Sequence, residues 1–292
     1  MTTEHSTIAD AEPLLSSGRV FRLAENPLWD AQRGTLFITD IDAGELYRVT
    51  PGDADAELIY RGPKVGGFTL EEDGNLALSR ESDIARFDPD AHETTGSIPA
   101  ARDGRQRFND VIALPDGSAL AGSIGSDGRP TPLVHVRPGG SMTDVSGAAS
   151  AIGNGFAWIA AGGLLWTDTP GRRLVRLALG SDGVRVADKA AYRVPDTATE
   201  GFPDGLTSDP TGRLYSARWA GGCVVVLDPC DAAALRWEPV GRIGVGAANV
   251  TACTFGGPSM NTLYITTAGG GLYRVTADRS GSAEFRSRIF CD

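Results

Sequence analysis

The chain has 292 residues, enough for one large all-β or α/β domain or for two small ones. Its formal net charge is −10 and it carries no basic stripe, so nucleic acid and anionic membranes are not expected partners. No apolar run approaches the roughly 18 residues of a membrane span.

We interpret residues 1–19 as a polar lead-in to a single domain over residues 20–292. The lead-in lacks the basic start and the apolar stretch of a secretory signal, so a cytoplasmic location is expected. The four cysteines form no Cys-x-x-Cys pair, and only three histidines occur. We therefore expect neither a thiolate zinc site nor histidine-based catalysis.

One unit recurs along the chain: a Gly or Asn, an apolar strand, a short polar turn and a second apolar strand. Six copies begin at Gly34, Gly74, Gly117, Gly163, Gly212 and Asn261. Their starts are 40 to 49 residues apart, and their alternating apolar residues predict a β-hairpin in each copy. We therefore predict an all-β fold, a six-bladed β-propeller with four-stranded antiparallel blades around a central channel. A two-sheet sandwich is the alternative.

A further apolar run precedes each hairpin and would form the innermost strand of a blade. Four of these runs carry a polar residue near their start: Glu25, Asn109, Asn154 and Asp204. They stand 9, 8, 9 and 8 residues before the Gly that opens the hairpin, and we assign the one-residue difference to the intervening turn. Near-equal offsets predict that the four side chains lie in one layer, near one mouth of the channel.

Two carboxylates and two amides around one axis would make an oxygen-rich cage. Such a cage suits a hard cation, Ca²⁺ above all, with Mg²⁺ or Mn²⁺ possible and Zn²⁺ less natural. The alternative is that each side chain only caps a turn at the solvent-filled mouth.

Arg107 lies two residues before Asn109, so both share one face of their strand, and the arginine could hold a polyhydroxylated or anionic substrate. Asp110 should point the other way, into the packing between blades. Trp29 and Trp158 fall in inner strands and are expected in the core.

Together these segments resemble the regucalcin/gluconolactonase family, which includes senescence marker proteins and related lactonases. The matching text within residues 23–275 is AENPLWD, GTLFITDIDAGELYRVTP, RFNDVIALPDG, NGFAW, FPDGLTSDPTGRLYSARWAGGCVVVLDP and CTFGGPSMNTLYITTA. The resemblance implies a six-bladed propeller with one divalent metal in its channel. By position, Glu25, Asn154 and Asp204 match the metal ligands, and Arg107 and Asn109 match substrate contacts. Asp204 also matches the general base.

The resemblance implies a carboxylic ester hydrolase that opens the ring of a lactone, commonly a sugar lactone, with a metal-activated water. The flanks at residues 24–27, 107–110 and 120–124 differ from the family pattern, and two alternatives stay open. The same metal site could act on another ester, a phosphotriester or an intermediate of specialised metabolism, or the propeller could bind metal without catalysis. We expect a monomer or weak homo-oligomer whose partner is a small lactone or related ester.

Overall fold

The computed structural model describes residues 6–101, 104–159, 163–180, 183–195, 200–230 and 236–290. Regular structure in these ranges is β-strand, apart from two short 3₁₀ helices, η1 (Ser126–Gly128) and η2 (Pro138–Gly140). None of the helices in the described ranges is long and apolar enough to cross a membrane. The predicted all-β class is confirmed.

The first three runs of strands each contain four consecutive strands that pair antiparallel. Run 1 consists of β3 (Phe21–Asp30), β4 (Thr35–Asp40), β5 (Glu45–Val49) and β6 (Glu57–Arg61). Run 2 consists of β7 (Val65–Leu70), β8 (Leu76–Arg80), β9 (Asp83–Asp88) and β10 (Glu93–Pro99). Run 3 consists of β11 (Arg105–Ala113), β12 (Ala119–Gly125), β13 (Thr131–Val136) and β14 (Met142–Ser150).

The remaining runs follow the same order, but the last one takes its outer strand from the start of the chain. Run 4 consists of β15 (Gly153–Ile159), β16 (Gly163–Asp168), β17 (Arg173–Gly180) and β18 (Gly183–Arg193). Run 5 consists of β19 (Phe202–Ser208), β20 (Leu214–Trp219), β21 (Cys223–Pro229) and β22 (Trp237–Gly244). Run 6 consists of β23 (Asn249–Gly256), β24 (Thr262–Gly270), β25 (Tyr273–Thr276) and β2 (Glu12–Pro13).

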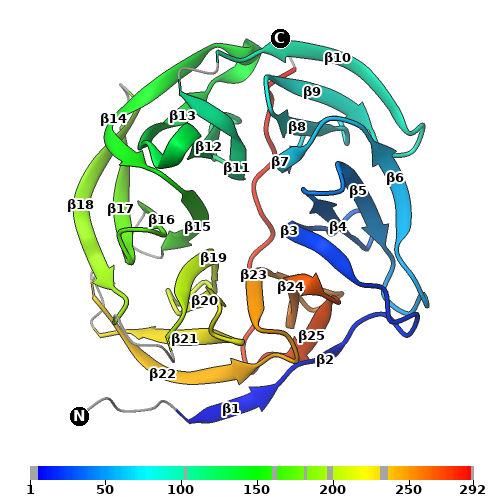
Figure 1. The fold of residues 1–292 in the computed structure, drawn as a ribbon, viewed down its shortest axis with the longest axis vertical. Helices are drawn as coiled ribbons and strands as arrows, with labels where there is room; N and C mark the ends of the chain where they lie inside the picture. Colours follow the sequence, from blue (N-terminus) through cyan, green and yellow to red (C-terminus); the bar gives the residue numbers. More distant parts are fainter. Residues whose placement is uncertain are drawn as a thin grey trace.

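The runs are arranged around a common centre, with the first strand of each run innermost (Figure 1). The second and third strands of each run are the hairpins predicted from the repeat, and all six are confirmed. Runs 6 and 1 also pair directly, because Ala268 of β24 lies opposite Leu23 of β3. The first strands therefore surround the space in which the predicted site residues lie.

Apolar side chains fill the interfaces between neighbouring runs. Phe37 of run 1 and Phe68 of run 2 belong to one buried cluster, and Trp29 of run 1 stacks on Tyr264 of run 6 with ring centroids 5.6 Å apart. Equivalent clusters lie at the other interfaces. Burial of each such side chain stabilises the fold by about 1.5–3 kcal/mol, so the contacts between runs hold the inner strands in place.

The expected lead-in contributes strands at the outer edge of the ring. β1 (Thr7–Asp10) pairs parallel with β22, and β2 pairs antiparallel with β25. Residues 1–5 of the lead-in lie outside the described residues. Backbone pairing of residues 7–13 thus links the start of the chain to runs 5 and 6.

The segment after β25, residues 277–290, crosses the centre of the ring (Figure 1). The backbone N–H of Gly281 donates to the carbonyl of Met260 at 2.8 Å. The ring of Phe285 packs edge-on against Trp158, with centroids 5.3 Å apart. Trp158 is thus covered by the C-terminal segment, and it is only partly buried where it was expected in the core. Trp29 is buried as predicted.

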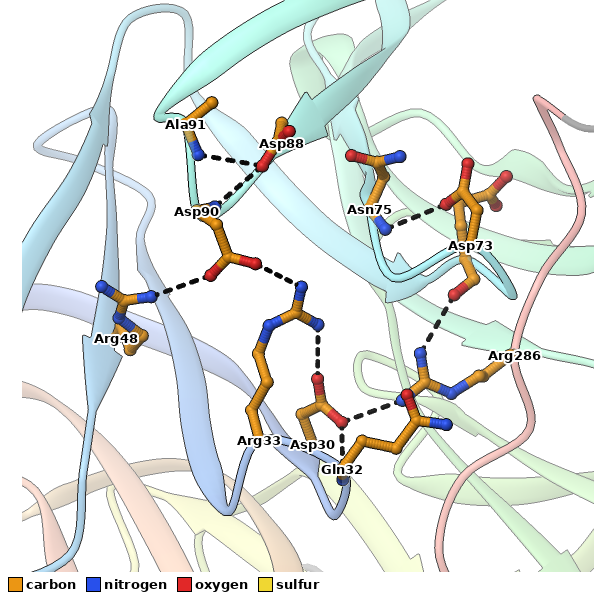
Figure 2. Close-up of polar contacts among 11 residues, drawn as sticks. Asp30, Gln32, Arg33, Arg48, Asp73, Asn75, Asp88, Asp90, Ala91 and Arg286 are labelled. Atoms are coloured by element: carbon orange, nitrogen blue, oxygen red, sulfur yellow. Dashed lines mark hydrogen bonds and ion pairs between the residues drawn. The ribbon is translucent and has the colours of Figure 1, made fainter.

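Ion pairs attach the C-terminal segment to the edge of runs 1 and 2 (Figure 2). Arg286 donates to Asp30 at 2.8 Å, and Arg33 donates to both Asp30 and Asp90 at 2.8 and 2.7 Å. Burial alone would raise the pKa of Asp30, but the hydrogen bonds from Arg33 and from the Gln32 backbone, with the charge of Arg286, lower it. The carboxylate is thus held ionised between two arginines.

Candidate functional site

A cavity of about 400 Å³, which we call the near cavity, lies among the inner strands. Five of its lining residues are those predicted from the sequence: Glu25, Arg107, Asn109, Asn154 and Asp204. The other seven were not predicted as site residues: Leu23, Ile124, Ile152, Thr169, Pro170, Phe202 and Trp219. The structure therefore brings all five predicted side chains to one place.

A β-bulge positions the polar residues within their strands. Each of the six inner strands has a register shift against its neighbour, for example between Glu25 and Leu28 in β3 and between Pro203 and Leu206 in β19. A bulge bends its strand and re-aims the side chain beside it. The shift beside the polar residue is one residue in each of β3, β11, β15 and β19, so the difference between repeats lies in the turns, as predicted.

The amides at the floor of the near cavity are fixed by a chain of hydrogen bonds. Arg107 Nη1 donates to Asn109 Oδ1 at 2.5 Å, and Asn109 Nδ2 donates to Asn154 Oδ1. Asn154 Nδ2 donates to Thr169 Oγ1 at 2.9 Å. The hydroxyl of Thr169 in turn donates to the carbonyl of Pro203 at 2.7 Å. The chain runs from β11 to β19 and orients each amide, because the next residue holds it.

The two carboxyl groups of the near cavity are buried, and the charge of Arg107 compensates them only in part. Burial raises the pKa of Glu25 to about 8, with a further increase from the charge of Asp110 and a partial decrease from Arg107. Burial, followed by the charge of Glu25, raises the pKa of Asp204 well above its ordinary value. Oδ1 of Asp204 is buried and has no hydrogen-bond partner among the residues that the structure describes. An orphaned carboxylate oxygen is costly, so this position favours a positive ligand.

The donor set fits one hard divalent cation. Glu25 and Asp204 supply carboxylate oxygens and Asn154 supplies an amide oxygen, the ligand types that Ca²⁺ and Mg²⁺ prefer. The described residues contain no group of three or more His, Cys, Asp or Glu side chains that could hold a metal. The near cavity has only two carboxylates, so the amide is needed to complete a set of three protein ligands.

A second, far cavity of about 20 Å³ lies one to three residues further along β3, β11, β15 and β19 and also borders β23. It is lined by Asn26, Pro27, Asp110, Val111, Ile112, Phe156, Leu206, Ala252, Cys253 and Glu284. Asp110 was expected to point into the packing between blades, and it instead faces this small cavity. The reason is that adjacent residues of a strand point in opposite directions, away from the near cavity that Asn109 lines.

Carboxyl groups also meet in the far cavity. Asp110 Oδ1 accepts a hydrogen bond from the Val111 backbone at 2.8 Å, while burial raises its pKa to about 7. Burial and the charge of Asp110 raise the pKa of Glu284 to about 8. Glu284 belongs to the C-terminal segment, and no sequence pattern pointed to it, because nothing in the repeat predicts where residues after the last hairpin lie.

The chain is similar to known proteins along most of its length. The model of the SMP-30/Gluconolactonase/LRE-like region matches residues 23–269. The pentonolactonase XacC of Haloferax volcanii is 32% identical over 92% of this chain and 95% of its own length. The 6-deoxy-6-sulfogluconolactonase of Pseudomonas putida is 28% identical over 84% of this chain and 83% of its own length.

A solved structure supports the same fold. A calcium-binding protein, regucalcin, from Agrobacterium tumefaciens superposes with a TM-score of 0.82 at 20% identity, covering 97% of this chain and 99% of its own. At that identity the likeness concerns the fold.

Proposed function

This chain belongs to the SMP-30/gluconolactonase/LRE-like family, and from this premise we propose that it is a divalent-metal-dependent lactonase whose reaction takes place in the near cavity. The observation that carries the proposal is the meeting of Glu25, Asn154 and Asp204 with Arg107 and Asn109 in one cavity. The 32% identity to a pentonolactonase over almost the whole chain supports lactone hydrolysis.

The scaffold of this site is a six-bladed β-propeller in our proposal, with each run of strands forming one blade. The apolar cluster between runs 6 and 1 and the pairing of Ala268 with Leu23 support a closed ring. β2 as the outer strand of run 6 supports closure by the two ends of the chain. Closure of the sheets around a centre removes exposed strand edges.

Glu25, Asn154 and Asp204 would hold the cation, which we propose to be Ca²⁺. When bound, it supplies Lewis-acid stabilisation of the carbonyl oxygen and a more acidic water. The orphaned Oδ1 of Asp204 and the raised pKa values of both carboxyl groups support a cation here, since positive charge would lower both pKa values. The regucalcin neighbour, described as calcium-binding, favours the same ion.

Asp204 acts as the general base. One of its carboxylate oxygens accepts a proton from the water as that water attacks the lactone carbonyl carbon. The ring C–O bond then breaks, and the proton passes to the departing alkoxide, which leaves a hydroxy acid. A base of this kind contributes about 10²- to 10⁴-fold to the rate.

Arg107 and Asn109 orient the substrate. Their side chains are joined at 2.5 Å, and Asn109 is held in turn by Asn154. A donor group with a fixed position lowers the entropic cost of the reaction. The guanidinium also places positive charge beside the developing oxyanion.

The direct test is lactone hydrolysis by protein stripped with EDTA, followed by acid release. Five- and six-membered lactones are supplied with Ca²⁺, Mg²⁺, Mn²⁺ or Zn²⁺ added back singly. We expect no turnover without metal and restoration by at least one ion. Restored turnover of a non-lactone ester or phosphotriester alone would replace the lactone proposal, and metal binding without any turnover would favour a non-catalytic protein.

A further inference from the structure

The near cavity has a polar floor and an apolar wall. The floor consists of Glu25, Arg107, Asn109, Asn154 and Asp204, and the wall consists of Leu23, Ile124, Ile152, Pro170, Phe202 and Trp219. The wall residues come from different runs of strands, so apolar surface borders the floor on several sides. Phe202 is 43% exposed, which is high for a side chain of its size.

The floor offers few donors to a substrate. Asn109 Nδ2 uses its two hydrogens on Gly153 O and Asn154 Oδ1. Asn154 Nδ2 donates one hydrogen to Thr169, whose own hydroxyl proton goes to a backbone carbonyl. Arg107 Nη1 donates to Asn109 and to the backbone. In the part of the chain that the structure describes, the donors that remain for a ligand are Nε and Nη2 of Arg107, one hydrogen of Asn154 Nδ2 and the indole N–H of Trp219.

The wall is held in place. The guanidinium carbon of Arg172 lies 4.7 Å from the centre of the Phe202 ring. Arg172 Nη2 also donates to Gly201 O at 2.7 Å, beside Phe202 in the chain. Ile124 and Ile152 form an isolated antiparallel bridge between runs 3 and 4. These contacts hold Phe202, Ile124 and Ile152 in place, so this part of the apolar wall is a fixed feature of the near cavity.

We propose that the substrate is a lactone with an apolar substituent on its ring, an alkyl chain or an aryl group, which binds against the wall while the lactone carbonyl meets the floor. This inference rests on the proposed lactonase function and deepens it. Each hydroxyl of a sugar lactone that met the wall without a partner would weaken binding about 5- to 150-fold. Each methylene of an alkyl chain would strengthen it about fourfold.

The size of the cavity agrees with this substrate class. Its volume of about 400 Å³ has room for about a dozen non-hydrogen atoms at the packing of liquid water. A five-membered lactone with a pentyl chain fills most of that space. A pentonolactone has nearly the same number of non-hydrogen atoms, so volume alone does not separate the two classes, and the polarity of the wall does.

The test compares kcat/KM for γ-butyrolactone, γ-valerolactone and γ-nonalactone with that for arabinono- and xylonolactone, using the metal-loaded protein. We expect kcat/KM to rise about fourfold for each methylene until the wall is covered, and the sugar lactones to fall below γ-nonalactone. Faster turnover of either sugar lactone than of γ-nonalactone would overturn this inference and leave the lactonase proposal intact.

Variants locate the effect in the wall. Phe202→Ala and Ile124→Ser should lower the ratio of kcat/KM for γ-nonalactone to kcat/KM for γ-butyrolactone about 10- to 100-fold, since the pentyl chain contacts the wall and the small substrate lacks that chain. Leu179→Ala, at a 36% exposed position of β17 away from the near cavity, is the matched control. Equal losses on both substrates would contradict a role of the wall in specificity.

A binding measurement separates this inference from the proposed reaction. Asp204→Asn protein with added Ca²⁺ is titrated with intact γ-nonalactone and with arabinonolactone, and ligand-observed NMR gives both Kd values. Tighter binding of γ-nonalactone supports the apolar wall even if no lactone is turned over by the wild-type protein. Tighter binding of arabinonolactone overturns the inference whatever the reaction is.

Discussion

The near and far cavities share one electrostatic feature and differ in what they can accommodate. Each contains two carboxyl groups with raised pKa values, Glu25 with Asp204 in the near cavity and Asp110 with Glu284 in the far one. The near cavity has about 400 Å³ and the far cavity about 20 Å³. The smaller volume suffices for about one water molecule, so the far cavity has no room for a substrate.

A raised carboxyl pKa is thus evidence of burial, and by itself it does not identify a functional site. In both cavities burial is the largest cause of the shift. What sets the near cavity apart is space, an orphaned oxygen on Asp204, and amides oriented by neighbouring strands. What sets the far cavity apart is its cover, since Glu284 is supplied by the C-terminal segment.

The largest expected effect belongs to the near cavity. Asp204→Asn should lower kcat for any lactone substrate about 10²- to 10⁴-fold, because the amide cannot accept the proton of the attacking water. Acid-release assays on the purified variant measure this. Asp144→Asn, the same change at an exposed position of β14, should keep full activity. Wild-type turnover by the Asp204 variant would remove the general base from the mechanism.

Added Ca²⁺ should raise the free energy of unfolding through the near cavity and not through the far one. At a Ca²⁺ concentration of 100 Kd, the stripped protein gains about 2.7 kcal/mol, or a Tm increase of about 5–10 °C. Glu25→Gln should lose most of this increase, because it removes one carboxylate from the proposed site. Glu284→Gln should keep it. The idea fails if scanning calorimetry gives the same increase for both variants.

The next effect concerns the attachment of the C-terminal segment. The fully buried carboxylate of Glu71 accepts hydrogen bonds from Ser287 Oγ and from the backbone N–H groups of Ile289 and Phe290. Glu71→Gln should destabilise the protein by about 1–3 kcal/mol and leave kcat on a small lactone within about twofold. Urea unfolding measures the loss.

Glu93→Gln is the control for this change, since this side chain is at an exposed position of β10. A large loss of activity in Glu71→Gln, without a change in unfolding, would mean that the segment acts on the near cavity.

The last effect should depend on pH and concerns Glu284. Its pKa is raised from 4.5 to about 8, so between these values the folded protein keeps a proton that the unfolded chain releases. Stability therefore falls as pH rises through this window. Glu284→Gln stays neutral and should have the Tm of the wild type near pH 4.5 and a Tm a few °C higher at pH 8.

Glu238→Gln, at an exposed position of β22, should show no such difference. A higher Tm of Glu284→Gln at both pH values would point to packing instead of titration.

Much of the fold could be predicted from local patterns. Alternating apolar residues with Gly or Asp at the turns predicted a hairpin in every copy, and the structure contains each of them. The prediction works because successive side chains of a strand point to opposite faces, so burial of one face gives an alternating sequence. The position of Glu25, Asn109, Asn154 and Asp204 in repeated strands also predicted their meeting. Equivalent residues of a repeat occupy equivalent places around an axis.

Other features could not be predicted, because they arise from contacts between distant parts of the chain. No local pattern indicated that residues 7–13 pair with β22 and β25, or that Glu284 faces Asp110. The bulges depend on how neighbouring strands pair. The apolar wall includes Phe202 and Trp219, and no sequence pattern predicted that these two residues line the cavity.

Short-range periodicity and side-chain chemistry predict the all-β class, the repeat, the hairpins and the polar residues of the floor. The apolar side chains that border the floor, the course of the C-terminal segment and the meeting of Asp110 with Glu284 follow from the folded chain alone. Burial and proximity are properties of the packed chain, and they depend on contacts such as the pairing of run 6 with run 1 rather than on any single strand.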